Sequence, residues 1–504
     1  MGKAALYSNS TGSELVAIGD SAMFSNAGAG QGLTAIGARA LLFNTSGNWN
    51  TAIGALSMRS NTTGGWNTGV GYGALYRNTT GNYNTALGSD VLSNNTTGYE
   101  NTAVGFGALN QNTTYWSNTA IGFQALYNNT ANSNTGVGHG VLASNIFGFG
   151  NVAVGASAAL DNTFGFYITA IGTGVLQNNT TGNDNTGVGA LALAANTTGA
   201  GNTAVGKDAL RNSDANYNSA FGYRSLESNT VGAANSAVGH SSLRLNLSGS
   251  YNTAVGVLAL DKNTDEANTA VGYQALAENT SGNYNTAIGE ESMENNSSGY
   301  QNAALGGSSL LANTTGFRNT ALGYLSNTSG SAQTNSTALG YNTVVSASNK
   351  VRLGNTAVTV VEGQVGYTTS DARFKTNVQP NVPGLSFING LRPVTYNFQK
   401  QLFSKHIGEM QDSSYVEELK RQDNLNLRST GFIAQEVEQL TNTLGYQFDG
   451  LHKPDNEHDT YSLGYAQFVV PLVKAVQELH TINSEQAKLI QDLQRRLDLL
   501  EKSK

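Results

Sequence analysis

The sequence predicts a mainly β protein: a β-solenoid (β-roll) of 17-residue repeats, expected to be homotrimeric, followed by a small α+β domain that ends in a long coiled-coil helix. Three observations predict this fold class. A 17-residue motif recurs through the first 340 residues, the composition changes near residues 350–370, and the final stretch has heptad spacing. We expect the solenoid at residues 1–340, a β-rich bridge at 341–369 and the α+β domain at 370–504.

The repeat reads N-T-A-[VI]-G-x-x-A-L-x-x-N-T-T-G-x-x, and the glycine of "TAIG" anchors each copy. Of the 19 intervals between the 20 anchors, 15 are 17 residues long, three are 16 and one is 18. A short and strict period of this kind is typical of a solenoid, in which each repeat covers the core of its neighbour. The anchors are Gly19, Gly37, Gly54, Gly71, Gly88, Gly105, Gly122, Gly138, Gly155, Gly172, Gly189, Gly206, Gly222, Gly239, Gly256, Gly272, Gly289, Gly306, Gly323 and Gly340.

Each repeat carries the elements of one coil. "NTAV" is a short β-prone segment that ends at the anchor glycine, and "NTTG" is a second turn signal. The segment "xxALxx" fits either a second strand or a single helical turn. Coils stacked at about 4.8 Å give a rod on the order of 95 Å long. Equivalent asparagines are expected to stack as an amide ladder: Asn50, Asn67, Asn84, Asn101 and Asn118.

The core of one coil is thin, because a repeat offers only one Val or Ile, one Leu and two Ala. Such a coil buries little apolar area by itself. The recurrent alanine of "TAIG" permits close approach of another chain. We therefore expect several chains around an axis, most simply three.

Aromatic residues recur near the loops of the repeat. They are either platforms for stacking sugars or side chains that pack on one another along the rod, and the sequence leaves both interpretations open. The N-x-T triplets are expected to be a by-product of the repeat, not glycosylation sites. The aromatic residues are Trp66, Tyr83, Tyr99, Trp116, Tyr217, Tyr251, Tyr284 and Tyr300.

Composition argues against several classes of function. A net charge of −7 is unfavourable for a nucleic-acid partner, and no apolar stretch is long enough to insert into a membrane. Cysteine is absent, and His452 and His458 are expected to be surface residues of a polar loop. We expect no metal and no cofactor.

The region after the repeats has different physical chemistry. All five prolines lie there, together with more than half of the charged side chains. A helix is expected over residues 466–502, with apolar residues in steps of three and four and with Asn483 and Gln486 on the same seam. That pattern is typical of a coiled coil with polar positions that fix register, although a lone amphipathic helix fits it too. The apolar seam is Leu472, Val476, Leu479, Ile490, Leu493, Leu497 and Leu500.

The repeats resemble the head repeats of trimeric autotransporter adhesins, which read roughly S-V-A-I-G-x-x-A and form left-handed β-rolls in trimers. Residues 101–109, "NTAVGFGAL", carry the likeness. This sequence departs from those proteins in its period of 17 instead of 14 and in lacking their membrane-anchor barrel. The resemblance implies a roll and a trimer, but not an autotransporter.

The C-terminal region resembles the intramolecular chaperone domain of phage endosialidases, tail spikes and tail fibres, to which a domain of myelin regulatory factor is related. An S-D-x-R-x-K motif matches Ser370, Asp371, Arg373 and Lys375, a G-x-I-A-Q-E-V motif matches residues 431–437, and the long helix follows in the same order. The resemblance implies a domain that trimerises, aligns the fibre strands and then cuts the chain between Thr369 and Ser370.

In that reaction Ser370 is the implied nucleophile and Lys375 the general base. A serine hydroxyl needs a base to take its proton, and a lysine can do so only where its surroundings lower its pKa enough to leave it neutral. Asp371 and Arg373 either orient the pair or form a structural ion pair. Each chain reacts once, so the expected enzyme is a single-turnover autoproteolytic serine peptidase without an external substrate.

The expected function is a trimeric tail or surface fibre of a virus, located on the virion, for attachment to a host. Its expected partners are a host cell-surface glycan or protein receptor, and tail or baseplate proteins. The alternative is a bacterial cell-surface adhesin or spacer filament. The absence of a signal-peptide core favours the virus, and the sparse carboxylates of the repeats argue against a glycan-cleaving enzyme. The first residues are already in repeat phase, so we expect either a distal piece or docking through the first coils.

Overall fold

The computed structural model describes residues 2–28, 30–361 and 370–503. It divides into two compact units, Met1–Arg318 and Asn319–Lys504. Together they contain a β-solenoid of about 20 turns with a repeat near 17 residues, a small α+β region and a long C-terminal helix. The predicted β-solenoid, α+β region and terminal helix are therefore confirmed, while the trimer and its coiled coil stay predictions.

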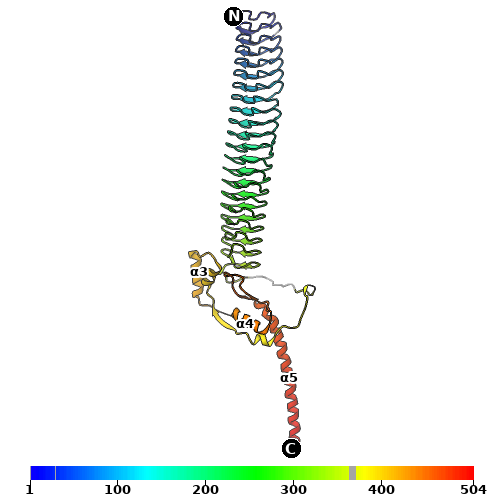
Figure 1. Cartoon of the computed structure of the whole chain (residues 1–504), viewed down its shortest axis with the longest axis vertical. Helices are drawn as coiled ribbons and strands as arrows, with labels where there is room; N and C mark the ends of the chain where they lie inside the picture. Colours follow the sequence, from blue (N-terminus) through cyan, green and yellow to red (C-terminus); the bar gives the residue numbers. More distant parts are fainter. Residues whose placement is uncertain (1, 29, 362–369, 504) are drawn as a thin grey trace. The chain divides into compact units, whose positions relative to one another are not determined.

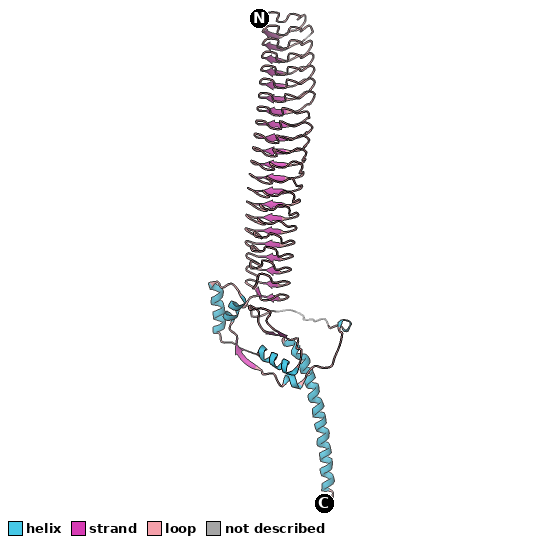
Figure 2. Ribbon diagram, in the orientation of Figure 1, coloured by secondary structure: helices cyan, strands magenta, loops and turns pink. Residues whose placement is uncertain are grey.

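The first unit is a stack of coils that each contribute one short strand (Figure 1). Figure 2 shows these strands one above another, with turns and loops making up the rest of each coil. Neighbouring strands pair in parallel and without slippage, as in Thr51 with Thr68 and Thr68 with Thr85. The strands are β1 Leu15–Ile18, β2 Leu33–Ile36, β3 Thr51–Ile53, β4 Thr68–Val70, β5 Thr85–Leu87, β6 Thr102–Val104, β7 Thr119–Ile121, β8 Thr135–Val137, β9 Val152–Val154, β10 Thr169–Ile171, β11 Thr186–Val188, β12 Thr203–Val205, β13 Ser219–Phe221, β14 Ser236–Val238, β15 Thr253–Val255, β16 Thr269–Val271, β17 Thr286–Ile288 and β18 Ala303–Leu305.

The segment "xxALxx" is neither of the two expected elements in these coils. Leu56 and Met58 both belong to this segment in the coil that begins at Asn50. Their φ values are 63° and 51°, in the left-handed region. Their backbone N–H groups point along the stack: Leu56 donates to the carbonyl of Ala38 at 2.9 Å and Met58 to that of Ala74 at 2.8 Å. Left-handed backbone costs about 1–2 kcal/mol for such a residue, and the hydrogen bonds to both neighbouring coils offset that cost.

In most strands the middle residue is an alanine that points inward, and the apolar residue after it does not. Ala52 is fully buried while Ile53 is exposed. The expectation that Val or Ile belongs to the core of its own coil is therefore wrong at these positions, because adjacent strand residues face opposite sides. The exposed residues form an apolar stripe, called here the strand stripe: Ile18, Ile53, Leu87, Ile121, Val154, Ile171, Phe221, Val238, Val255, Ile288 and Leu305.

The predicted asparagine ladder is present. The Nδ2 atom of Asn67 donates to Oδ1 of Asn50 at 3.1 Å, and Asn84 bonds Asn67 in the same way. The ladder continues through Asn101, and the backbone N–H of Asn118 donates to Asn101 Oδ1 at 3.0 Å. These side chains are buried, so the amide bonds replace those that water would otherwise make.

A second asparagine ladder, which the sequence did not lead us to expect, runs through the "NTTG" turns. Asn61 donates to Asn44 at 2.9 Å, and Asn78 donates to Asn61 at 2.8 Å. Asn50 Nδ2 also donates to the carbonyl of Gly64 at 2.7 Å, so the strand ladder bonds to the "NTTG" turn at the end of the same repeat. Amide side chains thus make up much of the interior that apolar residues would otherwise fill.

The anchor glycines are required by close approach between coils. Gly54 has a φ of 129°, and a Cβ atom there would lie 2.4 Å from the carbonyl oxygen of Gly71 in the next coil. A larger residue at this position would be strained and would force the coils apart.

Some of the recurrent aromatic residues stack in pairs. The ring centroids of Trp66 and Tyr83 are 5.2 Å apart, and those of Tyr99 and Trp116 are 5.9 Å apart. The first pair directly precedes the strand-ladder asparagine, whereas the second pair lies two residues before it. These four aromatics therefore lie in two columns, and both pairs pack along the stack while remaining exposed.

The second unit contains the last solenoid strands and the α+β region. Strands β19, β21 and β23 pair in parallel in that order. A core of Phe387, Val437, Phe448 and Phe468 holds the α+β elements together. The elements are β19 Thr320–Leu322, β20 Asn327–Thr328, β21 Thr337–Leu339, β22 Val344–Val345, β23 Val351–Leu353, η1 Ala372–Phe374, α1 Leu385–Ile388, β24 Val394–Asn397, α2 Lys400–Ile407, α3 Ser413–Asn424, β25 Arg428–Gly431, α4 Ala434–Leu444, β26 Leu451–His452, β27 Ser462–Leu463, η2 Tyr465–Phe468 and α5 Val469–Glu501.

The predicted terminal helix is η2 followed by α5, which has 33 residues. Every apolar seam residue from Leu472 to Leu500 is exposed along it. Among the described residues, no helix combines the length and apolar character needed to cross a membrane.

Candidate functional site

Ser370 and Lys375 are brought together by one short turn. The 3-10 helix η1 lies between them, and the backbone N–H of Lys375 donates to the carbonyl of Ala372 at 3.1 Å. This turn reverses the chain enough for Lys375 Nζ to donate to Ser370 Oγ at 2.7 Å. The two residues that the sequence singled out as nucleophile and base are therefore in direct hydrogen-bond contact.

Asp371 and Arg373 bond each other inside the same turn. Asp371 caps η1 by accepting from the backbone N–H of Arg373 at 2.9 Å, and its carboxylate also accepts from the guanidinium at 2.9 Å. These hydrogen bonds lower the pKa of Asp371 and raise that of Arg373. The pair stabilises the turn that separates Ser370 from Lys375.

The surroundings of Ser370 and Lys375 in the single chain are open to solvent, since both residues are exposed. In the arrangement described, Nζ of Lys375 is the donor and the serine oxygen the acceptor. General-base chemistry requires the opposite roles, and burial is the means by which a protein favours neutral lysine. Thr369, the expected residue on the other side of the cut, lies outside the residues that the structure describes.

The second predicted motif, residues 431–437, joins β25 to α4 and has a structural place. A Cβ atom at Gly431 would lie 2.2 Å from the hydroxyl of Tyr465, and that hydroxyl accepts from the backbone N–H of Phe432 at 3.1 Å. Val437 belongs to the core, and Glu436 forms an ion pair with Arg392. The motif therefore builds the α+β fold, while the dyad lies in a separate segment.

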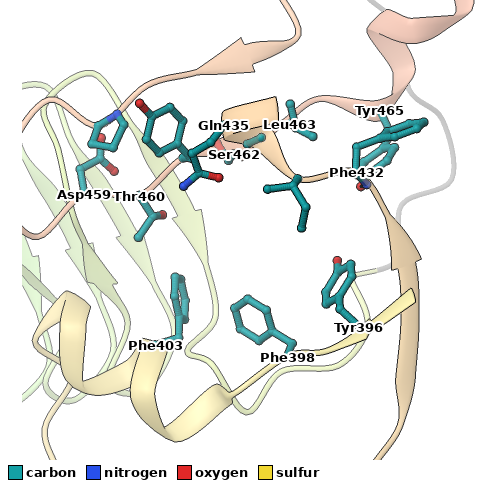
Figure 3. Close-up of a pocket in the computed structure, with 14 residues that line it drawn as sticks. Tyr396, Phe398, Phe403, Phe432, Gln435, Asp459, Thr460, Ser462, Leu463 and Tyr465 are labelled. Atoms are coloured by element: carbon teal, nitrogen blue, oxygen red, sulfur yellow. The ribbon is translucent and has the colours of Figure 1, made fainter. Parts of the chain in front are cut away.

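An aromatic pocket of about 530 Å³ lies beside this junction (Figure 3). Tyr396 and Phe398 form one wall, and Phe432 and Tyr465 lie across from them. The pocket was not predicted, because its walls come from segments far apart in the chain. The only signal for it in the sequence is the aromatic spacing of "VTYNF".

The histidine-containing loop also differs from its expectation. His458 contacts the backbone carbonyl of His406, but Nε2 of His452 lies 2.7 Å from Oδ2 of the buried carboxylate Asp459. His452 is thus part of a polar cluster and not a free surface residue. The described part of the chain contains no group of His, Asp and Glu placed to hold a metal ion.

A comparison with known proteins finds a match for part of the C-terminal region. Residues 370–446 match the peptidase S74 family model, described as the chaperone of endosialidase. This family is a class of self-cleaving chaperone domains. The match begins at Ser370, so the dyad and the core motif both lie within it. No curated protein matches this chain.

Proposed function

We propose that this protein is a trimeric viral tail or surface fibre for host attachment, assembled by its C-terminal chaperone domain, which then cuts the chain between Thr369 and Ser370. The observation that carries the proposal is the match to a self-cleaving chaperone class that begins at Ser370, directly downstream of a β-solenoid. The catalytic residues proposed are Ser370 and Lys375, with Asp371 and Arg373 supporting the turn between them.

Two exposed apolar surfaces support the trimer. The strand stripe runs along the coils, and the seam of α5 runs along a helix of 33 residues. Each buried Val, Leu or Ile side chain contributes about 1.5–3 kcal/mol when removed from water. Three copies of this chain would cover both surfaces, and the heptad spacing of the seam fits a coiled coil between the three α5 helices.

The proposed reaction is an acyl shift followed by hydrolysis. Ser370 Oγ attacks the carbonyl carbon of Thr369 through a five-membered ring while Lys375 accepts the hydroxyl proton. The peptide C–N bond then breaks, its nitrogen takes the proton from Lys375, and an ester joins Thr369 to Oγ. Water hydrolyses the ester, which leaves a carboxylate on Thr369 and restores the hydroxyl of Ser370. Each chain reacts once.

Assembly would switch this reaction on. In one chain both residues of the dyad are exposed to solvent. A neighbouring chaperone domain that covers residues 370–375 would remove Lys375 from water, and burial favours the neutral form that a general base needs. Cleavage would then report that three chains have met. Alignment by the C-terminal domain would also prevent chains from assembling out of register. Near-identical coils can pair one repeat out of register unless their ends are aligned first.

Mass spectrometry of the purified protein tests the cleavage. The expected products are a fragment ending at Thr369 and one that begins at Ser370. Ser370→Ala and Lys375→Ala are expected to give one intact chain, whereas Ser503→Ala, a serine change outside the dyad, is expected to leave cleavage unchanged. An intact wild-type chain after folding, or equal cleavage of Ser370→Ala, would reject the proposed dyad.

The proposed location is tested separately. Antibodies against the repeat region are expected to label purified virus particles and to block their adsorption to host cells. Labelling of bacterial envelopes in the absence of virus would instead support the cell-surface adhesin or spacer filament.

A further inference from the structure

Two buried carboxylates of the α+β domain bind the last solenoid strand and the residues beside it. The first is Glu409, which is 3% exposed and follows α2. It accepts from Arg352 of β23 at 2.9 Å and from the backbone N–H of Thr356 at 3.1 Å, and its other oxygen accepts from the hydroxyl of Tyr415. Burial and then the bond to Glu409 raise the pKa of Tyr415, so its hydroxyl remains a donor.

The second carboxylate is Asp459, which is also 3% exposed. Its Oδ1 atom accepts from Lys350 Nζ at 2.7 Å and from Ser346 Oγ at 2.9 Å, and its Oδ2 atom contacts His452. Burial disfavours its charge, but the hydrogen bonds from Lys350 and His452 outweigh burial and lower the pKa of Asp459 well below its usual range. Asp459 is therefore a buried anion held by groups of the solenoid end.

The two cations stand at particular positions of the repeat. Strand β23 pairs with β21 so that Arg352 is opposite Ala338, the inward-facing position that is alanine in most strands. Lys350 directly precedes β23, and its counterpart Ser336 continues the strand ladder by donating its backbone N–H to Asn319 Oδ1 at 3.0 Å. The two inward columns of the solenoid thus end in cations, and each cation binds a carboxylate of the α+β domain.

Further contacts join the same two segments. The hydroxyl of Tyr341 donates to Asp412 at 2.7 Å. Asn342 bonds Met410 through both amide atoms, donating to its carbonyl at 2.9 Å and accepting from its N–H at 2.8 Å. All the solenoid residues in this network precede position 362, and all their partners follow Ser370.

We propose that the chaperone domain stays bound to the end of its own fibre after the chain is cut, as a non-covalent cap held chiefly by Arg352–Glu409 and Lys350–Asp459. The proposal rests on the cleavage proposed above. Cutting the backbone leaves every contact of this network intact. The surface to which the chaperone domain binds is the end of the solenoid, which a further coil would otherwise cover. Terminal repeats of a solenoid need such a cap to keep their interior from water.

The test separates this cap from self-cleavage. In a Ser370→Ala chain, the recognition sequence of a site-specific protease replaces residues 362–369, and the added protease makes the cut. Size-exclusion chromatography in physiological salt then follows the two fragments. The expected result is that they elute together, and a failure of self-cleavage does not affect this outcome.

Charge-neutral variants identify what holds the fragments. The double variant Glu409→Gln/Asp459→Asn is expected to raise the dissociation rate of the cut complex by at least about tenfold, since it removes hydrogen bonds to buried charges. Lys350→Met/Arg352→Met changes the other fragment and is expected to raise the dissociation rate as well. Agreement between the two variants shows that misfolding of one fragment is not the cause. The matched control is Glu417→Gln/Asp492→Asn, which removes two carboxylates whose ion pairs lie wholly downstream of the cut. Separation of the unmutated fragments on cutting, or control-like retention in both charge-neutral variants, would overturn the proposal.

Discussion

Lys375 donates to Ser370 across a single helical turn at 2.7 Å, yet both side chains are exposed. The hydrogen bond gives proximity, but both groups are open to solvent. Assembly is the step that can supply the missing burial, which leads to the first prediction.

Disrupting the α5 seam is expected to stop cleavage at a distance. Leu493→Lys places a charge on the seam, so trimer formation and cleavage should fall together. Gln491→Lys adds the same charge on an exposed position outside the seam and should change neither. Light scattering and mass spectrometry of the same samples measure the two effects. Full cleavage in a monomeric Leu493→Lys protein would show that one chain suffices.

The strand stripe is expected to be an interface between chains. Val238 lies on the stripe in β14, and Val231 is an exposed valine of a loop seven residues earlier. Val238→Ser should lower the free energy of unfolding of the trimer by about 1.5 kcal/mol per chain or more. Val231→Ser should stay within about 0.5 kcal/mol. Denaturant unfolding monitored by circular dichroism compares them, and equal effects would leave the stripe as an ordinary surface.

The second asparagine ladder can be tested with two adjacent residues. Asn179 is buried, donates to Asn162 at 2.8 Å and accepts from Asn196 at 2.8 Å, whereas Asn178 is exposed. Asn179→Ala leaves buried polar groups unpaired and should cost about 1–3 kcal/mol of unfolding free energy per chain. Asn178→Ala should be nearly neutral, and an equally small effect at Asn179 would contradict the ladder's contribution.

Retention of the chaperone domain is expected to depend on pH at both extremes. The bond from Tyr341, then those from Tyr415 and Ser414, lower the pKa of Asp412 to about 2. A lowered carboxylate pKa stabilises the complex above the ordinary value near 3.8, and that contribution is lost as the pH falls towards 2. The bond to Asp412 in turn raises the pKa of Tyr341 to about 12, so its contribution is lost between pH 10 and 12. Elution of the cut complex across pH measures both limits, and Tyr341→Phe should remove the alkaline one.

The exposed aromatic columns are expected to contribute to host recognition. Trp66→Ala/Trp116→Ala should weaken binding of the fibre to host cells while leaving trimerisation and cleavage unchanged. Unchanged binding would leave these rings as stacking residues only, and the receptor site would then lie elsewhere on the fibre.

The sequence predicted features that repeat strictly. Asn67 and Gly54 recur at a fixed spacing, and a ladder or a close backbone contact follows directly from stacking identical coils. The direction of Ile53 was misjudged because a three-residue strand does not show which of its alternating faces is covered. The backbone at Met58 could not be foreseen either, since no residue preference signals a buried side chain in the left-handed region.

The site divides in the same manner. The motif pointed to Ser370 and Lys375 as a pair, and in the structure the turn between them brings their side chains into hydrogen-bond contact. The cation at Arg352 could have been noticed, because "NKVRLG" aligns with "NSTALG" and puts charge where alanine belongs. Its partner Glu409 could not, since the two are 57 positions apart and only tertiary structure brings them together.

The uniform register of the solenoid has a consequence for how its length can vary. Thr169 pairs with Thr186, and Thr186 pairs with Thr203. Each coil therefore makes the same contacts with the coil before it as with the coil after it. Removing or duplicating one 17-residue unit would therefore create no new kind of contact and would leave both ends untouched. The length of the solenoid is then set by the number of repeats, and duplication within the gene would change it in steps of one strand spacing. The C-terminal domain bound to the solenoid end would stay unchanged.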